Sequence, residues 1–359
     1  MSYMFGLEHA NKNFETASAY GKNTFTTAFP VAMSSYIHSR GLDQNYIRAT
    51  LDAHNMPTTE HVLRPLPSLI GIDPEQAFFA FEDSFSGYDE YAVNIANRSD
   101  IVVMNCKTMD EVSALEVKLV AVPTSGTANR ERSQQLCELV VRPPSIEQLC
   151  FSVAASYGQN RRQEIGNIIV EALEDPMDYN WSSESFMLEH RKQILEAAYE
   201  LIRRGLNSQR PLVLMGVWRT QGQAPKLDKN CFDAFYWSSL AFLQLFTNCM
   251  AGAIERNTQS IGRPERALIW FIKSMFDYAA QGRVTFERTH SLITFGGQTD
   301  KAGSFTNNNI KKFVLSDNFI TPRITREEKE NIISSTGIEM LMPERRLDSV
   351  LYYEVTSFE

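Results

Sequence analysis

Two acidic residues and one lysine stand out in a predominantly apolar part of the chain. Glu116 and Lys118 are two residues apart in the apolar run 114–122, and Asp100 opens another apolar run, 101–104. Alternate side chains of a strand point to opposite faces, so a strand over 114–122 would carry Glu116 and Lys118 on one face. Charges in such a strand are costly unless they are paired or exposed in a cleft. We expect the two strands to lie side by side and to gather one carboxylate–lysine cluster.

These residue types could hydrolyse a phosphodiester bond. The reaction requires neutralising the scissile phosphate and supplying hydroxide near pH 7, and magnesium does both when carboxylates hold it. Asp100 and Glu116 would supply those oxygens, and the backbone carbonyl of Val117 could add another. Lys118 could orient or deprotonate the attacking water, or stabilise the charge on the pentacovalent phosphate. The working hypothesis is a magnesium-dependent nuclease site.

The acid–x–Lys triplet alone is weak evidence for a nuclease. A second copy, Glu327–Lys329, lies in a charged run without a strand around it. A structural salt bridge between Glu116 and Lys118 is therefore the alternative, and the apolar strand context and Asp100 favour the nuclease site. Competing motifs are poorer, because the six histidines form no HxH or HExxH and the chain has no GxSxG or GxGxxG.

The elements that must position these residues alternate between strands and helices. Strands are predicted over 76–81, 101–104, 114–122, 138–142 and 211–218, and helices over 145–157, 163–174, 189–205 and 264–278. Ser145 is the expected capping residue of the first of these helices. We expect helices and polar loops over 1–64, and an apolar strand ending in a Gly-rich turn over 291–299. The alternation favours an α/β fold with a mixed central sheet.

The composition is that of an ordinary soluble globular protein, with 43% hydrophobic and 22% charged residues. Residues 1–16 lack the basic segment and apolar core of a signal peptide. The five cysteines form no CxxC pair, so we expect a reduced, cytoplasmic protein without a zinc knuckle. The stretch 232–254 is apolar enough to suggest a membrane span, but Asp233, Gln244 and Asn248 interrupt it. A buried core or dimer-interface helix is the better interpretation.

The net charge of −8 argues against a protein that coats nucleic acid nonspecifically. It does not exclude a sequence-specific DNA enzyme, in which basic groups are local and metal-binding carboxylates add negative charge. Pairs of basic residues recur along the chain, and each favours a solvated face over a phosphate contact. These pairs are Arg130/Arg132, Arg161/Arg162, Arg203/Arg204, Arg263/Arg266, Lys311/Lys312, Arg323/Arg326 and Arg345/Arg346.

The residues around the triplet resemble a known family. The runs Glu116–Pro123 and Glu138–Pro143 resemble the signature region of the HindVP family of type II restriction endonucleases. Gly21–Asn23, Phe29–Pro30 and Pro343–Leu347 add to the resemblance, which is spread over most of the chain. The resemblance implies a PD-(D/E)XK restriction-endonuclease-like fold, with a mixed central sheet flanked by helices. It also implies magnesium dependence and cleavage of double-stranded DNA at a short palindrome of the GRCGYC type.

Carried over residue by residue, the resemblance assigns the catalytic motif. Asp100 matches the motif's aspartate, Glu116 the second acid and Lys118 the lysine, with Asp100, Glu116 and the Val117 carbonyl as metal ligands. Ser99 replaces the proline that precedes the aspartate in the motif, which leaves the metal ligand intact. Thr124 stands where an acidic residue is expected, which weakens only the fine alignment.

Nucleases of this fold often add an acid from an earlier element. Glu82 is the candidate here, with Asp83 beside it and Glu60 as a weaker choice, and a capping or surface role is the alternative for each. The residues that bind DNA bases cannot be chosen among the arginines. The turn at Gly296–Gln298 and the loop Thr299–Asn309 are plausible elements facing the DNA groove.

The resemblance also bears on partners and organisation. A palindromic target implies a twofold homodimer, and a restriction system implies a cognate DNA methyltransferase as a functional, not physical, partner. We expect one compact nuclease over 1–359, with a catalytic core of about 65–220 and additions for DNA recognition and dimerisation over 221–359. Two other functions stay open: a noncatalytic sequence-specific DNA-binding protein that keeps the fold, and a nonspecific repair or recombination nuclease.

Overall fold

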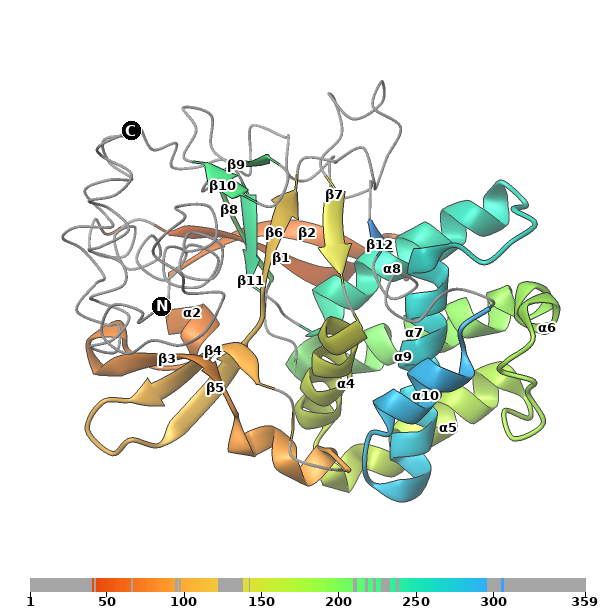
Figure 1. The fold of residues 1–359 in the computed structure, drawn as a ribbon, viewed down its shortest axis with the longest axis horizontal. Helices are drawn as coiled ribbons and strands as arrows, with labels where there is room; N and C mark the ends of the chain where they lie inside the picture. Colours follow the sequence, from red (N-terminus) through yellow and green to blue (C-terminus); the bar gives the residue numbers. More distant parts are fainter. Residues whose placement is uncertain are drawn as a thin grey trace, which may run out of the picture.

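A computed structural model gives the architecture of most of the chain. It describes residues 41, 43–65, 67–93, 96, 98–121, 138–141, 143–208, 212–216, 219–221, 224–226, 233–236, 239–295 and 305–306. In these ranges the protein is a mixed α/β structure, with the strands gathered on one side and most of the helices on the other (Figure 1). The expectation of an α/β fold is confirmed at this level.

A three-stranded antiparallel sheet contains the strand of Asp100. Its order is β3 (Ala77–Asp83), β4 (Ser99–Asn105) and β5 (Glu111–Leu115), so β4 is the central strand. The apolar run at the middle of β4 is fully buried from Ile101 to Val103, as expected for a strand covered on both faces. The predicted strands over 76–81 and 101–104 are confirmed.

A larger sheet contains the strand of Lys118. Nine strands of the described ranges belong to it, in the order β10–β9–β6–β11–β8–β1–β2, with β7 on β6 and β12 on β7. Their bounds are β1 Gln44–Leu51, β2 Pro57–Arg64, β6 Val117–Ala121, β7 Glu138–Val141, β8 Leu212–Gly216, β9 Arg219–Gln221, β10 Ala224–Lys226, β11 Asp233–Tyr236 and β12 Phe305–Thr306. Strands β6 and β9 pair in parallel and the other pairs are antiparallel, so the sheet is mixed.

The predicted strand over 114–122 is in fact two strands in two sheets. β5 ends at Leu115 and β6 begins at Val117, which leaves Glu116 as the link between them. β5 pairs with β4 in the small sheet, whereas β6 pairs with β11 in the large one. The alternation expected through Glu116 is therefore wrong, because the chain changes its pairing partner at this residue.

The expectation of helices and loops up to residue 64 is wrong for 44–64, which form the hairpin β1–β2. The Asp52 carboxylate accepts hydrogen bonds from the backbone N–H groups of His54 and Met56 across the turn. Asn55 adopts a left-handed conformation with φ of 62°. Both features are typical of Asp and Asn in turns, so the turn chemistry was the missed signal.

The helical layer forms the other half of the molecule (Figure 1). The longer helices are α4 (Pro143–Tyr157), α5 (Arg162–Leu173), α7 (Arg191–Gly205), α8 (Ser239–Glu255) and α9 (Arg263–Gln281). Shorter turns are α2 (Pro67–Ile70), η3 (Pro74–Gln76), η4 (Ser86–Tyr91), η5 (Gln159–Arg161), α6 (Glu184–Glu189), η6 (Leu206–Ser208) and α10 (Phe286–Leu292). Helix α9 packs against α4, α5, α7 and α8, and α8 also contacts β1, β2 and β8. The helices predicted over 163–174, 189–205 and 264–278 are confirmed to within a few residues.

Two later predictions need correction. The apolar stretch 232–254 begins with β11, and the helix α8 starts only at Ser239; its residues 240–246 are fully buried, which confirms a core helix. The strand expected from Ser291 is wrong, because residues 286–292 form α10 and 293–295 are not in a strand; 296–299 lie outside the described residues. None of the helices in the described ranges is long and apolar enough to cross a membrane.

Candidate active site

The register of the small sheet brings Asp100 and Glu116 together. Ile101 of β4 pairs with Leu115 of β5, and Asp100 precedes Ile101 while Glu116 follows Leu115, so the two acids flank the last pair of this antiparallel ladder. Paired residues of antiparallel strands have Cβ atoms about 4.5–5.5 Å apart, so side chains next to such a pair start close enough to reach one cation. Both residues are partly buried. The two acids expected from the motif therefore lie at adjacent positions of the fold.

Glu82 occupies the third position at the same level of the sheet. Asp83 of β3 pairs with Ser99 of β4, so the preceding residue Glu82 falls opposite Asp100. We call the positions of Glu82, Asp100 and Glu116 the acidic rung. It includes β3, β4 and the residue that follows β5, at the end of the small sheet where the chain passes into β6.

The other two acids considered from the sequence lie elsewhere. Asp83 is exposed, and its carboxylate accepts the backbone N–H of Ser84. Glu60 lies in β2, where it forms an ion pair with Arg48 of β1 across the hairpin. Their surroundings fit the capping and surface roles that were the alternatives for them.

Lys118 is the second residue of β6, where it pairs with Phe235 of β11. The argument from one continuous strand no longer connects it to Glu116, because the strand breaks there. Sequence proximity connects them instead, since two residues of extended chain span at most about 7 Å. Lys118 therefore lies near the start of β6, the strand of the large sheet that directly follows Glu116 of the acidic rung.

Helix α4 contacts the rung through buried polar side chains. Ser145 Oγ donates a hydrogen bond of 3.4 Å to Glu116 Oε1, and Ser99 Oγ donates one of 3.4 Å to Gln148 Oε1. The expected capping role of Ser145 is wrong, because α4 begins two residues earlier, at Pro143. Proline is favoured in the first helical turn, where its missing N–H costs nothing. The contribution of Gln148 was not visible in the sequence, because no motif marks it.

The donor set at the rung suits a hard divalent cation. Magnesium prefers carboxylate oxygens and usually takes one or two of them, with water in its other positions. Among the side chains that the structure describes, no group of three or more His, Cys, Asp or Glu could hold a metal ion. Asp100 and Glu116 would give two carboxylates, and Glu82 and the Val117 carbonyl are the candidates for a further protein ligand.

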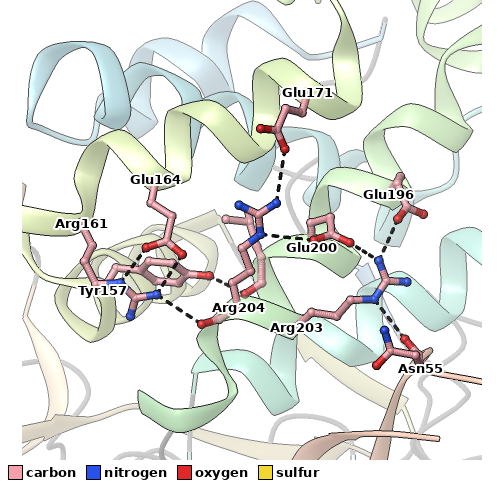
Figure 2. A network of polar contacts seen from close by, with 10 residues as sticks. Asn55, Tyr157, Arg161, Glu164, Glu171, Glu196, Glu200, Arg203 and Arg204 are labelled. Carbon is pink, nitrogen blue, oxygen red and sulfur yellow. Dashed lines mark hydrogen bonds and ion pairs between the residues drawn. The ribbon is translucent and has the colours of Figure 1, made fainter. Parts of the chain in front are cut away.

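Three arginines of the helical layer, Arg161, Arg203 and Arg204, form ion pairs with glutamates of the same chain (Figure 2). Arg161 Nε lies 2.8 Å from Glu164 Oε2, and this hydrogen bond lowers the pKa of Glu164. Arg203 pairs with Glu196 and Glu200, and also donates to the backbone oxygen of Asn55 in the hairpin turn. Arg204 pairs with Glu171 and Glu200. These guanidinium groups join α5, α7 and the hairpin.

Arg266, in the next basic pair along the chain, also contacts groups of its own chain. Its guanidinium carbon lies 5.4 Å from the centre of the Trp270 ring, and Nη1 donates to the backbone oxygen of Thr294. The other basic pairs, at 130/132, 311/312, 323/326 and 345/346, lie outside the described residues, as does the turn 296–298. Of the loop 299–309, only the two residues of β12 are described.

Comparison with known proteins gives a consistent answer over the whole chain. The family model described as HindVP restriction endonuclease matches residues 20–358. The type II restriction enzyme HgiDI of Herpetosiphon aurantiacus is 33% identical over 361 residues, which cover 99% of this chain and 97% of that protein. The probable type II restriction enzyme HindVP of Haemophilus influenzae is 28% identical over 359 residues, or 98% and 93% of the two chains. No solved structure matches. The resemblance expected from the residues is confirmed, and the chain belongs to the HindVP restriction endonuclease family, a family of site-specific deoxyribonucleases.

Proposed function

We propose that this protein is a magnesium-dependent type II restriction endonuclease of PD-(D/E)XK fold, which hydrolyses double-stranded DNA and leaves 5′-phosphate ends. The observation that carries the proposal is the acidic rung, beside Lys118, in a chain that belongs to a restriction endonuclease family. Asp100 and Glu116 are the proposed metal-binding acids. The backbone carbonyl of Val117 and the acid at Glu82 are the further candidates.

The clustering of like charges supports a cation at this place. Carboxylates set directly opposite each other in a sheet repel and destabilise it. Asp100 and Glu116 flank the last pair of the β4–β5 ladder, and the position of Glu82, across from Asp100 on β3, adds a third acid at the same level. A divalent ion would offset that repulsion, so the arrangement is costly for folding alone but suited to binding metal.

The proposed chemistry divides between the ion and the protein. Bound magnesium would stabilise the charge that develops on the scissile phosphate and ease ionisation of the attacking water. Asp100 and Glu116 fix the place of that charge. Lys118 orients the water or takes its proton, or stabilises the pentacovalent phosphate. The water oxygen bonds to phosphorus as the bond to the 3′ oxygen breaks, which yields a 5′-phosphate and a 3′-hydroxyl.

The target and the assembly belong to the same proposal. We infer a short palindromic site of the GRCGYC type, a twofold homodimer and a cognate methyltransferase in the same system. The expected DNA-recognition and dimerisation additions over 221–359 remain part of the proposal. Within that range α8 is buried in the core, so we assign the DNA contacts to the other segments of 221–359.

Incubation of the purified protein with plasmid DNA and magnesium tests the proposal. Discrete fragments that disappear on adding EDTA are expected, and sequencing of their ends gives the recognition site and the cut position. A smear would instead indicate a nonspecific nuclease, and intact DNA with retained binding a noncatalytic DNA-binding protein. Cleavage by Lys118→Ala at the wild-type rate would show that the catalytic assignment is wrong.

A further inference from the structure

Helix α4 meets both strands that bring Asp100 and Glu116 together. Ser145 and Gln148 are three residues apart, so they lie on the same face of α4. Ser145 bonds Glu116 itself, and Gln148 bonds Ser99, the residue that precedes Asp100 in β4. Ser145, Gln148 and Ser99 are only 2%, 4% and 1% exposed, so water does not compete freely for these hydrogen bonds.

Glu116 lies between the two sheets and contacts helix α4. The strand pairs end at Leu115 in the small sheet and start again at Val117 in the large sheet, so Glu116 is part of neither ladder. The Ser145 hydroxyl donates to Oε1 of Glu116, which restricts rotation of the carboxylate. Because α4 begins at Pro143, this hydroxyl is not used as the helix cap.

We propose that Ser145 is a positioning residue for the Glu116 carboxylate, and that Gln148 supports it by fixing the end of β4 beside Asp100. This inference rests on the proposed function, because it assigns the two acids to a divalent ion. Carboxylates that bind metals are themselves oriented by hydrogen bonds, and removal of such a partner typically costs 10- to 100-fold in metal affinity or activity. The inference gives α4 a role beyond packing in the core.

Binding of Mn²⁺ to the full-length protein without DNA tests the inference directly. Manganese favours the same carboxylate and water ligands as magnesium, and the electron paramagnetic resonance signal of free Mn²⁺ reports how much is bound. We expect Ser145→Ala to bind Mn²⁺ about 10-fold more weakly than the wild type, the lower end of the range for such partners. The magnesium concentration for half-maximal cleavage should rise by a similar factor. Gln148→Leu should have a smaller effect, because it acts through Ser99.

Three further variants separate positioning from a general loss of structure. Ser145→Thr keeps a hydroxyl and should restore Mn²⁺ affinity. Ser156→Ala is the matched control, because Ser156 lies on the same helix and donates to the backbone oxygen of Val153, at 2.8 Å, within that helix; this variant should bind Mn²⁺ as the wild type does. In a Glu116→Gln background, Ser145→Ala should cause no further loss, since interacting residues are not additive.

The outcomes distinguish the inference from the function on which it rests. Wild-type Mn²⁺ affinity in Ser145→Ala, in a protein that itself binds Mn²⁺ and cleaves DNA, overturns the positioning role and leaves the proposed function intact. Lost affinity that Ser145→Thr does not restore, together with a lowered melting temperature, also overturns it and indicates a structural hydroxyl. A wild-type protein that neither binds Mn²⁺ nor cleaves DNA overturns both.

Discussion

Charges are arranged in opposite ways in the helical layer and at the acidic rung. In the helical layer, Arg203 lies between Glu196 and Glu200, and Arg161 pairs with Glu164 (Figure 2). The pairs Glu200–Arg203 and Arg161–Glu164 are three residues apart, and opposite charges at this spacing stabilise helices slightly. At the rung, three acidic positions lie close together at the end of one sheet, and carboxylates held close together cost stability. This difference is the one expected if the first arrangement serves the fold and the second serves the proposed metal ion.

The buried ion pair between Arg191 and Glu265 in the helical layer also differs from the acidic rung, because its charges are opposite in sign. Arg191 Nη1 lies 3.4 Å from Glu265 Oε1 and 2.8 Å from Thr258 Oγ1, and the side chains of Arg191 and Glu265 are only 9% and 5% exposed. Burial raises the pKa of Glu265, and the N–H of Gly262 and the charge of Arg191 oppose that rise. Here each charged group is enclosed by partners. Removal of one partner would leave the other buried and uncompensated.

The largest effect expected at the rung is on catalysis and not on folding. Asp100→Asn should lower the rate of plasmid cleavage by about 10³-fold, as loss of a group that stabilises transition-state charge does. Its free energy of unfolding should stay equal or rise by a few tenths of a kcal/mol, because one repulsion between opposed carboxylates is removed. Cleavage assays and urea denaturation of the same preparation measure both. A variant that cuts normally, or that loses activity only by unfolding, would remove the contrast between the regions.

The second largest effect is expected on stability in the helical layer. Glu265→Ala should lower the free energy of unfolding by about 3 kcal/mol, because it leaves the Arg191 guanidinium buried without its carboxylate. The effect of magnesium on the fraction of folded protein should be the same in this variant as in the wild type. Glu287→Ala in α10, which removes an exposed glutamate, is the control and should change stability by less than about 0.5 kcal/mol. Equal stability of the two variants would show that burial does not set the importance of these charges.

The sequence predicted the strands of the rung better than their alignment. β3 and β4 are apolar runs bounded by polar residues, so the sequence alone predicted them as strands, without knowledge of the strands with which they pair. The alignment of Glu82 with Asp100 depends on strand register, which is a long-range property that no local pattern encodes. The break at Glu116 was equally hidden, because the residues after it continue to look like a strand while pairing with β11, more distant in the chain.

Local interactions explain the other differences between the predicted and the observed elements. Pro143 extends α4 backwards, so that Ser145 becomes available to Glu116 instead of capping the helix. In the hairpin β1–β2, the signal was the turn from Asp52 to Met56, whose side-chain hydrogen bonds favour a reversal over a helix. The candidate motif residues were chosen from the sequence and stay a prediction, whereas the contact of Ser145 with Glu116 could be found only in the fold.

A smaller effect should distinguish two adjacent acids at the end of β3. Register assigns Glu82 to the rung and sets Asp83 opposite Ser99. Glu82→Gln should reduce the cleavage rate by about 10-fold, as for loss of a supporting group at a metal site. Asp83→Asn is the matched control, because it changes the neighbouring carboxylate, which bonds only the adjacent Ser84 N–H among its described contacts, and it should cut normally. The reverse result would assign Asp83 to the site and require a shifted register.

The smallest effect is expected at the exposed pair of the helical layer. The hydrogen bonds from Arg161 lower the pKa of Glu164 in the folded state, so this pair stabilises the protein above the ordinary pKa of the carboxyl and loses its effect as the pH falls through the lowered value. Glu164→Gln should therefore cost about 0.3–0.5 kcal/mol at neutral pH, since the side chains are 38% and 31% exposed and such pairs are weak.

The difference between wild type and Glu164→Gln in urea denaturation should then shrink on acidification. Cleavage and DNA affinity should not change, because Arg161 is interpreted as a structural group. Stronger DNA binding by Glu164→Gln would mean that the glutamate restrains a guanidinium that can reach phosphate. In that case the helical layer would also serve a ligand, and opposite-charge pairing would no longer separate the structural charges of this protein from the functional ones.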